Sequence, residues 1–338
     1  MEESFHRKRG RAEVRVFSPG AQIGHCKCSP PLQRAMVDFG SEHSYEKAAR
    51  NLKEHYGIEV PVSSIVRAGH RHGAQCTAFE RQSEEGPCGT LICEMDGSMI
   101  PIVENDPGEG TGKDRRKHKE TLWKEVKLCA VERQEDGTVG YAATLGCVEE
   151  AGLELYGLTL TAGAAESTPI HGVGDGAIWI KDQFDDLFGD RSSYLIDFFH
   201  LCEYLAEASR SCRPEQPESW IRTQRKRMKK NQLTKVLEEL EKNLEPASTP
   251  RTEAPVRRCY QYISNRPDQF NYEEALEQEL PIGSGLIESG HRHVIQQRLK
   301  ISGAWWKKQN AQRMLNLRVL RANGAWDAYW QWDLEIAA

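Results

Sequence analysis

Three acidic residues lie at positions where a carboxylate could take part in catalysis. Asp96 follows an apolar run and precedes a glycine, and Asp175 lies between two glycines at the end of a second strand pattern. Glu288 comes early in a predicted helix, after the residues GSGLI. Burying an unpaired charge is costly, so a carboxylate in an apolar setting needs a partner. Two carboxylates at strand ends and one on a helix would form an oxygen-rich pocket suited to Mg²⁺ or Mn²⁺.

Two such ions, roughly 3.5–4 Å apart, can clamp the attacking and leaving oxygens of a phosphodiester. Each acid also has a simpler interpretation that the residues alone leave open. Asp96 could form a turn with its glycine, Asp175 could be a helix N-cap, and Glu288 could be a first-turn charge that meets the helix dipole. The order strand, strand, helix on one framework favours the metal site.

The elements that would position these carboxylates form a mixed α/β pattern. Alternating or continuous apolar runs predict three strands, followed by a helix and then by two strand–helix units. These segments are 90–103, 123–133, 139–145, 148–166, 170–189 and 193–209.

Helical patterns flank this α/β region on both sides. Residues 1–29 read as a basic, flexible lead-in, and residues 30–79 have the helix–turn–helix outline of a DNA-binding region or, alternatively, of a small packing domain. In that region Ser44 is predicted to cap a helix that stops at Gly57, and Ser63 to open the next helix. Residues 203–280 and 281–338 are predicted to be helical.

Four motifs give the chain a recognisable pattern: EMDGSM at 94–99, GVGDGAIWI at 172–180, DFFHLCEYL at 197–205 and PIGSGLIESGHR at 281–292. With them the chain resembles a DDE transposase, most closely the ISKra-type insertion-sequence family, which is related to the Mutator-like transposases. The resemblance implies a ribonuclease-H-like mixed sheet in residues 90–202 and an all-helical insertion over 203–280. It further implies that the core is completed by the C-terminal helices of 281–338.

The same resemblance implies an activity and its residues. Asp96, Asp175 and Glu288 would hold Mg²⁺ or Mn²⁺, as two ions, and Asp197 with His200 would form an Asp-x-x-His pair in the active site. The enzyme would cut double-stranded DNA at element ends and join the 3′-OH to target DNA, as a homo-oligomer. Alternatives are a DNA-binding protein that has lost catalysis, a structure-specific nuclease of the same fold, and, for Asp197 with His200, a helix cap.

Basic residues separated from the acids predict where DNA would lie. There are three basic runs: 113–119, 222–230 and 289–324. The simpler interpretation of 222–230 is a solvated helix face, and that of Trp305 and Trp306, within 289–324, is core packing. His291 and Arg292 follow Glu288 by one turn, and the three are expected to share a helix face. The full set of predicted DNA contacts is Arg67, Arg71, Arg225, Arg227, Lys230, His291, Arg292, Arg298, Lys307 and Lys308.

The composition and charge of the chain argue against several classes of protein. The chain has 338 residues, 28% charged residues and a formal net charge of −5, which argues against a simple polycation that coats DNA. No run of about 18 apolar residues predicts a membrane span, and the start lacks a secretory signal pattern. The 10 scattered cysteines read as reduced thiols, so a cytoplasmic, nucleoid-associated location is expected.

Overall fold

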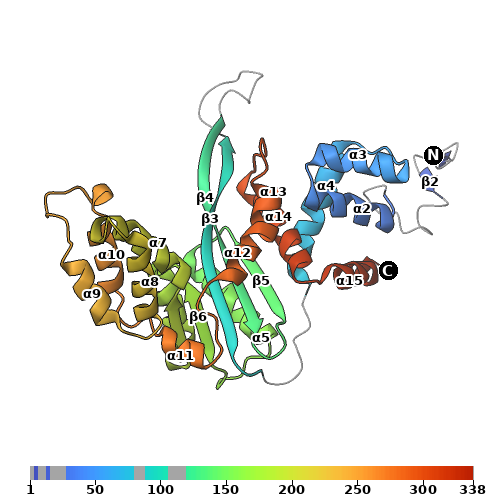
Figure 1. Cartoon of the computed structure of the whole chain (residues 1–338). Coiled ribbons are helices and arrows are strands. Elements are labelled where there is room, and N and C mark those ends of the chain that lie inside the picture. Colours follow the sequence, from blue (N-terminus) through green and yellow to red (C-terminus); the bar gives the residue numbers. More distant parts are fainter. Residues whose placement is uncertain (1–3, 7–12, 16–27, 80–87, 106–118, 338) are drawn as a thin grey trace.

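A five-stranded mixed sheet lies at the centre of the computed structural model, which describes residues 4–6, 13–15, 28–79, 88–105 and 119–337 (Figure 1). The strand order is β5-β4-β3-β6-β7. The central strand β3 runs parallel to β6, which is parallel to β7, and antiparallel to β4, which is antiparallel to β5. The strands are β3 (Leu91–Asn105), β4 (Lys119–Arg133), β5 (Val139–Thr144), β6 (Ile170–Gly174) and β7 (Ser192–Ile196). The predicted mixed α/β architecture is confirmed.

The strand β3 continues through Asp96 and Gly97 instead of turning there. Asp96 pairs with Leu128 and Gly97 with Lys127, inside a ladder that extends over the full length of both strands. The turn interpretation of Asp96 is therefore wrong. The predicted basic run 113–119 lies outside the described residues except for Lys119, the first residue of β4. Most of the predicted lead-in is also outside them, and within it β1 (Ser4–His6) pairs with β2 (Glu13–Arg15).

The two faces of the sheet are covered by different helices. Successive residues of β4 alternate between the faces, with Cys129 packed in one core cluster and Leu128 in the other. The first cluster includes residues of α5 (Val148–Thr161), α6 (Ile178–Phe188) and α7 (Phe198–Cys212). The second includes residues of the C-terminal elements α12 (Gly285–Gly290), η4 (His291–Gln296, a π-helix), α13 (Gln297–Leu299) and α14 (Lys308–Ala322).

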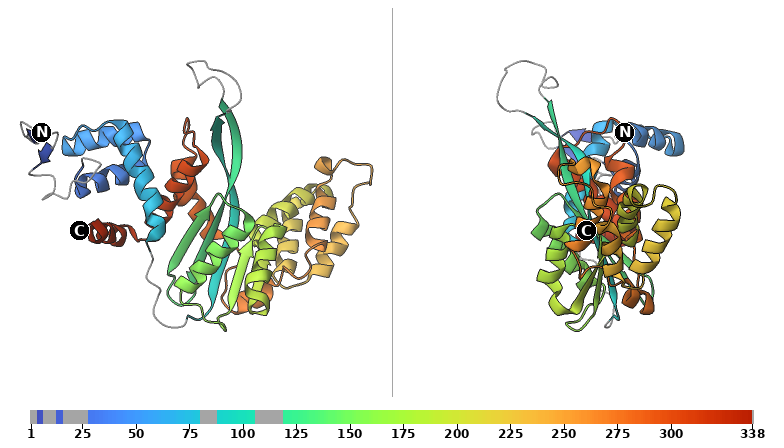
Figure 2. Two further views of the ribbon diagram at one scale, coloured as in Figure 1. Left: turned by 180° about the vertical axis from the view of Figure 1, so that it is seen from behind. Right: turned by 60° about the vertical axis from the view of Figure 1, so that its left-hand side comes forward.

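A helical lobe, residues 198–277, stands on the β7 side of the sheet, and the N-terminal helices stand on the other side (Figure 2). Within 203–280 the regular elements are all helical, as predicted. After α7 they are α8 (Pro217–Met228), α9 (Leu233–Glu241), the 3₁₀-helix η3 (Arg251–Glu253), α10 (Pro255–Ser264) and α11 (Tyr272–Glu277).

The N-terminal helices form a third cluster together with the end of the chain. Ser44 caps the second of them through the main-chain N–H of Lys47 at 3.3 Å, and Gly57 ends it with a left-handed φ of 66°, so these two predicted signals are confirmed. The next helix begins at Val62, after Pro61 as its N-cap, so the predicted start at Ser63 is wrong. A Cβ at Gly73 would lie 2.3 Å from the carbonyl oxygen of Arg313, so only glycine allows this close approach to α14. The elements are α2 (Pro30–Glu42), α3 (Tyr45–Tyr56), α4 (Val62–Gln75), the 3₁₀-helix η1 (Cys76–Ala78) and α15 (Trp326–Ala337).

Within the described ranges, the chain forms no helix whose length and apolar character would let it cross a membrane.

Candidate active site

Asp96 and Asp175 lie in register beside each other, one within β3 and the other directly after the neighbouring parallel strand β6. Glu94 of β3 pairs with Val173 of β6, and each aspartate lies two residues beyond its member of that pair. Because β3 and β6 run in the same direction, both side chains belong to the same edge of this part of the sheet. β6 ends at Gly174, whereas β3 continues, so Asp96 lies within a strand and Asp175 lies in a loop.

The loop after β6 is fixed by hydrogen bonds. Oδ1 of Asp175 accepts from the main-chain N–H of Ala177 at 2.8 Å, and its main-chain oxygen accepts from the hydroxyl of Tyr262 at 2.7 Å. Gly176 has a φ of 84°, a conformation that favours glycine. The N-cap of α6 is Ala177, so the interpretation of Asp175 as the N-cap is wrong.

Asp96 is paired with a buried histidine. Nε2 of His291 donates to Oδ2 of Asp96 at 2.8 Å, and Oδ1 of Asp96 accepts from the N–H of Gly97 at 2.7 Å. His291 is 7% exposed, and its Nδ1 has no hydrogen-bond partner among the described residues. The imidazole therefore holds one carboxylate oxygen of Asp96 in place.

The predicted shared face of Glu288, His291 and Arg292 does not form. Glu288 and Arg292 are exposed, whereas His291 is buried against β3. The physical reason is that His291, the first residue of the π-helix His291–Gln296, is hydrogen-bonded to Asp96 of β3, while Glu288 and Arg292 face solvent. As a DNA contact His291 is a wrong prediction, because its ring is enclosed and committed to Asp96.

Glu94 is a site residue that the sequence reasoning missed. Its carboxylate is buried, and Oε2 accepts from the main-chain N–H of Ile287, in the first turn of α12, at 2.6 Å. Burial raises the pKa of Glu94 to about 8, against the lowering effect of that hydrogen bond. The spacing in the sequence could have identified Glu94, because an acid two residues before Asp96 in a strand lies on the same face of the sheet as Asp96.

Asp197 serves as the cap of α7. Its Oδ1 accepts from the main-chain N–H groups of Phe199 and His200, at 2.5 and 3.1 Å. Its Oδ2 accepts from the main-chain N–H of Ser284 at 2.8 Å and from the hydroxyl of the same serine. The buried carboxylate thus ties the start of α7 to Ser284, the N-cap residue of α12, as the helix-cap alternative predicts.

Asp175 and His200 line one cleft of about 720 Å³, between the sheet and α10. Nδ1 of His200 lies 3.5 Å from a carboxylate oxygen of Glu203, and its ring meets Tyr262 edge-on. We call this the arginine cleft, because its lining includes Arg251, Arg258 and Arg266. Arg266 donates to the main-chain oxygen of Gly176 at 3.0 Å, which places a guanidinium next to the Asp175 loop.

The oxygen ligands of these carboxylates are of the type that a hard cation prefers, but the three side chains do not lie close enough together to bind one ion. Asp96 and Asp175 are half-buried and Glu288 is exposed, so each can be reached from solvent. Carboxylate oxygens are the donors that Mg²⁺ and Mn²⁺ prefer. Across the described ranges, no three His, Cys, Asp or Glu side chains are grouped closely enough to hold one ion together. Asp96, Asp175 and Glu288 would have to move closer to bind a metal.

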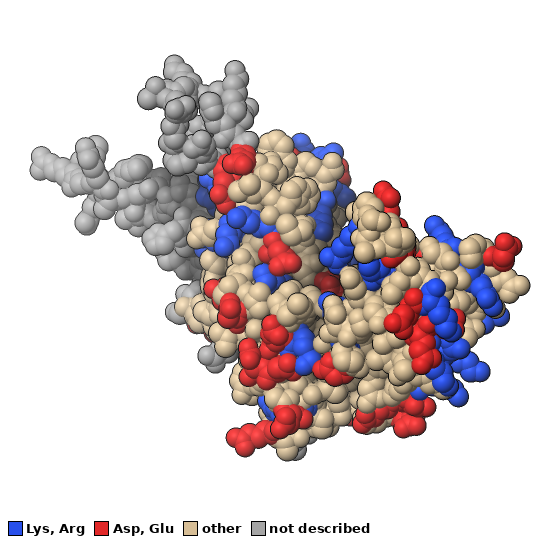
Figure 3. Space-filling model, turned by 90° about the vertical axis from the view of Figure 1, so that its left-hand side faces the viewer, with Lys and Arg blue, Asp and Glu red and all other residues tan. Residues whose placement is uncertain are grey.

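A second cleft of about 770 Å³ lies along the basic run 222–230. We call it the lysine cleft; its lining residues are Phe198, Phe199, Arg225, Lys226, Lys229, Lys230, Glu273, Leu276 and Glu277. Arg225 and Lys230 line this cleft, whereas Arg227 is turned toward Gln224 Oε1 at 3.1 Å. Figure 3 shows the side of the molecule that carries the helical lobe, with Lys and Arg gathered along one edge.

Arg298 is not a DNA contact, and this prediction is wrong. Its side chain is 2% exposed, Nε donates to the main-chain oxygen of Gly40 at 2.9 Å, and the guanidinium lies 4.8 Å from the ring centres of Tyr45 and Trp306. Trp306 is buried, as the core-packing alternative predicts. Lys307 and Lys308 are exposed.

The remaining predicted contacts lie on α4. Arg67 and Arg71 are exposed, and Nη2 of Arg67 donates to the hydroxyl of Ser64 at 3.1 Å. Asn316 of α14 donates to the main-chain oxygen of Gly73, so α4 also packs against α14. The helix has one open basic face and one packed face.

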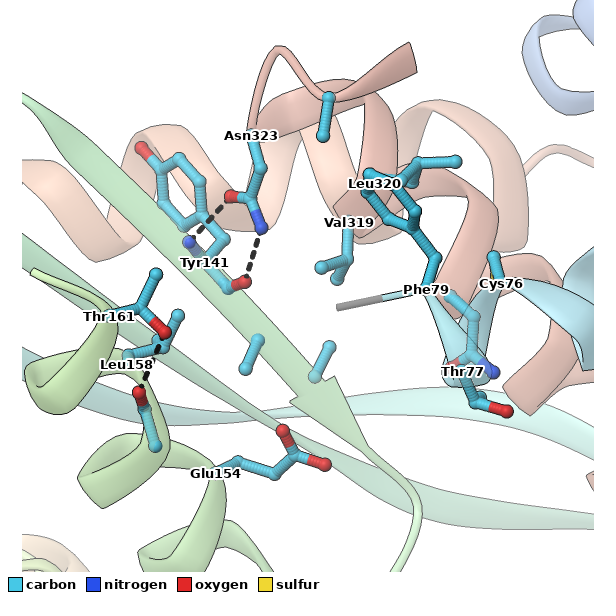
Figure 4. A pocket seen from close by; sticks show the side chains of 15 residues that line it. Cys76, Thr77, Phe79, Tyr141, Glu154, Leu158, Thr161, Val319, Leu320 and Asn323 are labelled. Carbon is cyan, nitrogen blue, oxygen red and sulfur yellow. Dashed lines mark hydrogen bonds between the residues drawn. The ribbon is translucent and has the colours of Figure 1, made fainter. Parts of the chain in front are cut away.

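A further cavity of about 380 Å³ lies apart from these residues, between α5, β5 and α14 (Figure 4). Asn323 bridges to the main chain of Tyr141 beside it, and Glu154 faces it. Burial raises the pKa of Glu154, followed by repulsion from Glu150. None of the predicted site residues lines this cavity, so it plays no part in the candidate site.

Comparison with known proteins places the chain in a family. The chain shows a TM-score of 0.35 and 8% identity to the Drosophila P element transposase strand transfer complex, over 93% of this chain and 84% of that chain. Similarity this low supports no inference about function. A search of curated proteins finds no match. The model of an uncharacterised protein family, UPF0236, matches residues 164–333, about half of the chain, and the protein belongs to this family.

Proposed function

We propose that the protein is a DNA transposase of the ISKra type, which cleaves DNA with the carboxylates of Asp96, Asp175 and Glu288. One observation carries the proposal: the two aspartates lie in register, with Asp96 in β3 and Asp175 one residue after the end of the parallel strand β6. The helix that bears Glu288 is hydrogen-bonded to β3 through Glu94. The motifs around these residues and the mixed sheet support a ribonuclease-H-like core.

Mg²⁺ or Mn²⁺ would be held by Asp96, Asp175 and Glu288, and would supply an activated water and charge stabilisation at the phosphate. His291 keeps the Asp96 carboxylate oriented through its 2.8 Å hydrogen bond. Glu94 fixes the first turn of α12 and so limits the positions of Glu288. Both are positioning residues, since they act through the acids beside them.

The substrate would be bound by positive charge around the acids. His200 and the arginines of the arginine cleft are suited to contact the phosphate next to Asp175. Hydrolysis there frees a 3′-OH at the element end, and this hydroxyl then attacks a phosphodiester of target DNA. Both steps are in-line displacements at phosphorus, so no covalent enzyme intermediate is required, and two ends are joined by a homo-oligomer.

A second candidate is DNA binding without cleavage. The separation of the carboxylates within the described part of the chain favours it, because catalysis requires them to hold ions jointly. The exposed cations of the lysine cleft would serve either function.

Cleavage of a supercoiled plasmid that carries the gene with its flanking DNA distinguishes the two. We expect nicks or breaks at discrete positions with Mg²⁺ or Mn²⁺, and binding without efficient cutting with Ca²⁺, whose looser coordination misplaces the nucleophile. Cutting in excess EDTA would contradict the proposal. Binding that never leads to cutting with Mg²⁺ or Mn²⁺ would support the second candidate.

A further inference from the structure

Phe199 is an exposed aromatic side chain that contacts the protein on one side of its ring. It is 67% exposed at the second position of α7. Its main-chain N–H donates to Asp197 at 2.5 Å, and its ring meets that of Phe198 edge-on, with centroids 6.0 Å apart. The ring also rests on the main chain at Gly283, where a Cβ would lie 2.7 Å from Cδ2 of Phe199. A glycine is needed there for the ring to take this position.

Four cations line the same cleft as this ring. The lysine cleft brings Arg225, Lys226, Lys229 and Lys230 together with Phe199. Nζ of Lys229 lies 4.7 Å from the ring centre of Phe198, so positive charge and aromatic surface are in direct contact. Apart from Leu276, the opposite wall carries the acids Glu273 and Glu277, which limit how far a polyanion could spread across the cleft.

The cleft adjoins the candidate active site through Asp197. The same carboxylate that holds the N–H of Phe199 also accepts from Ser284, the N-cap residue of α12. Glu288 lies on α12, so a strand bound in the lysine cleft would leave it beside the proposed cutting site. An aromatic face beside a row of cations is the arrangement by which proteins hold unpaired nucleotides, with the base stacked and the phosphates paired.

We propose that Phe199 and the lysine cleft bind an unpaired nucleotide of a DNA strand, with the base stacked on Phe199 and the phosphates at Lys226, Lys229 and Lys230. The proposal rests on the proposed function, because it assigns the cleft to the same DNA. Beyond the proposed function, the proposal says that the DNA strand is unpaired near the position where it is cleaved. A base taken out of the duplex in this way costs unstacking energy, which stacking on the protein offsets.

The test uses the full chain in EDTA, so that cleavage does not contribute, and a single-stranded oligonucleotide that contains 2-aminopurine. Stacking on an aromatic ring changes the fluorescence of this base. For Phe199→Leu we expect a loss of that signal and about tenfold weaker single-strand binding, since stacking contributes about 1–3 kcal/mol per base and 1.4 kcal/mol is tenfold. Phe199→Trp should retain both, and duplex binding should stay unchanged.

Ile178→Ala is the matched control, because Ile178 is an exposed apolar residue at the start of α6, outside the lysine cleft. Wild-type signal and affinity in Phe199→Leu, with normal duplex cleavage in Mg²⁺, would overturn this proposal and leave the proposed function intact. Absence of DNA binding in the wild type would overturn both. Tighter, Phe199-dependent binding of RNA of the same sequence would overturn the assignment to DNA.

Discussion

Two basic runs, 222–230 and 289–324, both contain Lys and Arg without Asp or Glu, yet their side chains have different environments. In 222–230 the cations Arg225, Lys226, Lys229 and Lys230 line an open cleft. In 289–324 two arginines are among the most enclosed side chains of the protein, with Arg298 at 2% and Arg318 at 5% exposure. A count of Lys and Arg makes both runs candidates for DNA binding. The contacts in the folded protein distinguish them, because the cations of the first run line a cleft and two arginines of the second run are buried.

The second run joins the N-terminal helices to the C-terminal ones. Arg318 of α14 donates to the main-chain oxygens of Ser41 and His293, at 3.2 and 3.0 Å, and forms an ion pair with Glu42. Arg321 adds a second ion pair to Glu42 at 2.7 Å. These guanidiniums are structural because carbonyl and carboxylate acceptors of α2 and of the adjoining helices meet their fixed donor geometry.

The largest expected effect is on stability, at Arg298. The variant Arg298→Ala loses the hydrogen bond to the main-chain oxygen of Gly40 and the contacts of the guanidinium with the rings of Tyr45 and Trp306, and it leaves a cavity. We expect the free energy of unfolding to fall by about 3 kcal/mol in urea titrations. Arg292→Ala, at an exposed position of the same run, should change it by less than about 0.5 kcal/mol. Equal effects of the two variants would remove the contrast between buried and exposed arginines.

A second effect follows from His72, in the N-terminal cluster that the second run anchors. Burial and then the charge of Arg71 lower the pKa of His72 to about 3. Its Nδ1 lies 2.8 Å from the hydroxyl of Tyr329 and 3.9 Å from a carboxylate oxygen of Asp333, and Gln33 faces its Nε2. The ring is therefore neutral in the folded protein at neutral pH.

The pKa of His72 in the folded protein lies below its ordinary value of 6.5. The stabilising contribution of His72 to the free energy of unfolding is therefore fully present above pH 6.5 and is lost as the pH falls toward 3. Between pH 7 and pH 5 the free energy of unfolding should decrease by about 2 kcal/mol from this group. Urea titrations at the two pH values measure it, and His72→Gln should lose that part of the pH dependence. A wild-type protein that gains stability on acidification through this range would contradict the account.

The smallest effect is expected at the first run. The double variant Lys226→Ala, Lys230→Ala should weaken DNA binding and reduce the slope of log affinity against log salt by about 0.9 for each lost phosphate contact. Its stability should change by no more than about 0.5 kcal/mol, since both side chains are exposed. Arg227→Ala is the control, because Arg227 bonds to Gln224 instead of lining the cleft. A full salt slope in the double variant would show that the cleft holds no phosphates.

Local signals in the sequence were sufficient for much of the fold. Ser44 and Gly57 bound a helix as predicted, since capping depends on neighbouring residues only. The continuation of β3 through Asp96 could not be read in the same way, because it depends on pairing with β4 across the whole ladder.

The acidic residues of the candidate site could be predicted from the sequence, whereas the positioning residues Glu94 and His291 could not. Asp96 and Asp175 were found from strand patterns, and the register places them at equivalent positions. The roles of Glu94 and His291 depend on α12 and the π-helix packing against β3, which no local pattern encodes. Arg298 was misassigned for the same reason, since its acceptor at Gly40 is distant in the sequence.

The central claim is that Asp96, Asp175 and Glu288 together carry metal-dependent cleavage. Asp175→Asn, Asp96→Asn and Glu288→Gln keep the shape of each side chain and remove the charge that a cation needs. Each should abolish cleavage of the plasmid with Mg²⁺ or Mn²⁺ and leave duplex binding near the wild-type value. If any of the three variants cuts at close to the wild-type rate, that residue has no place in the site and the account of catalysis is wrong.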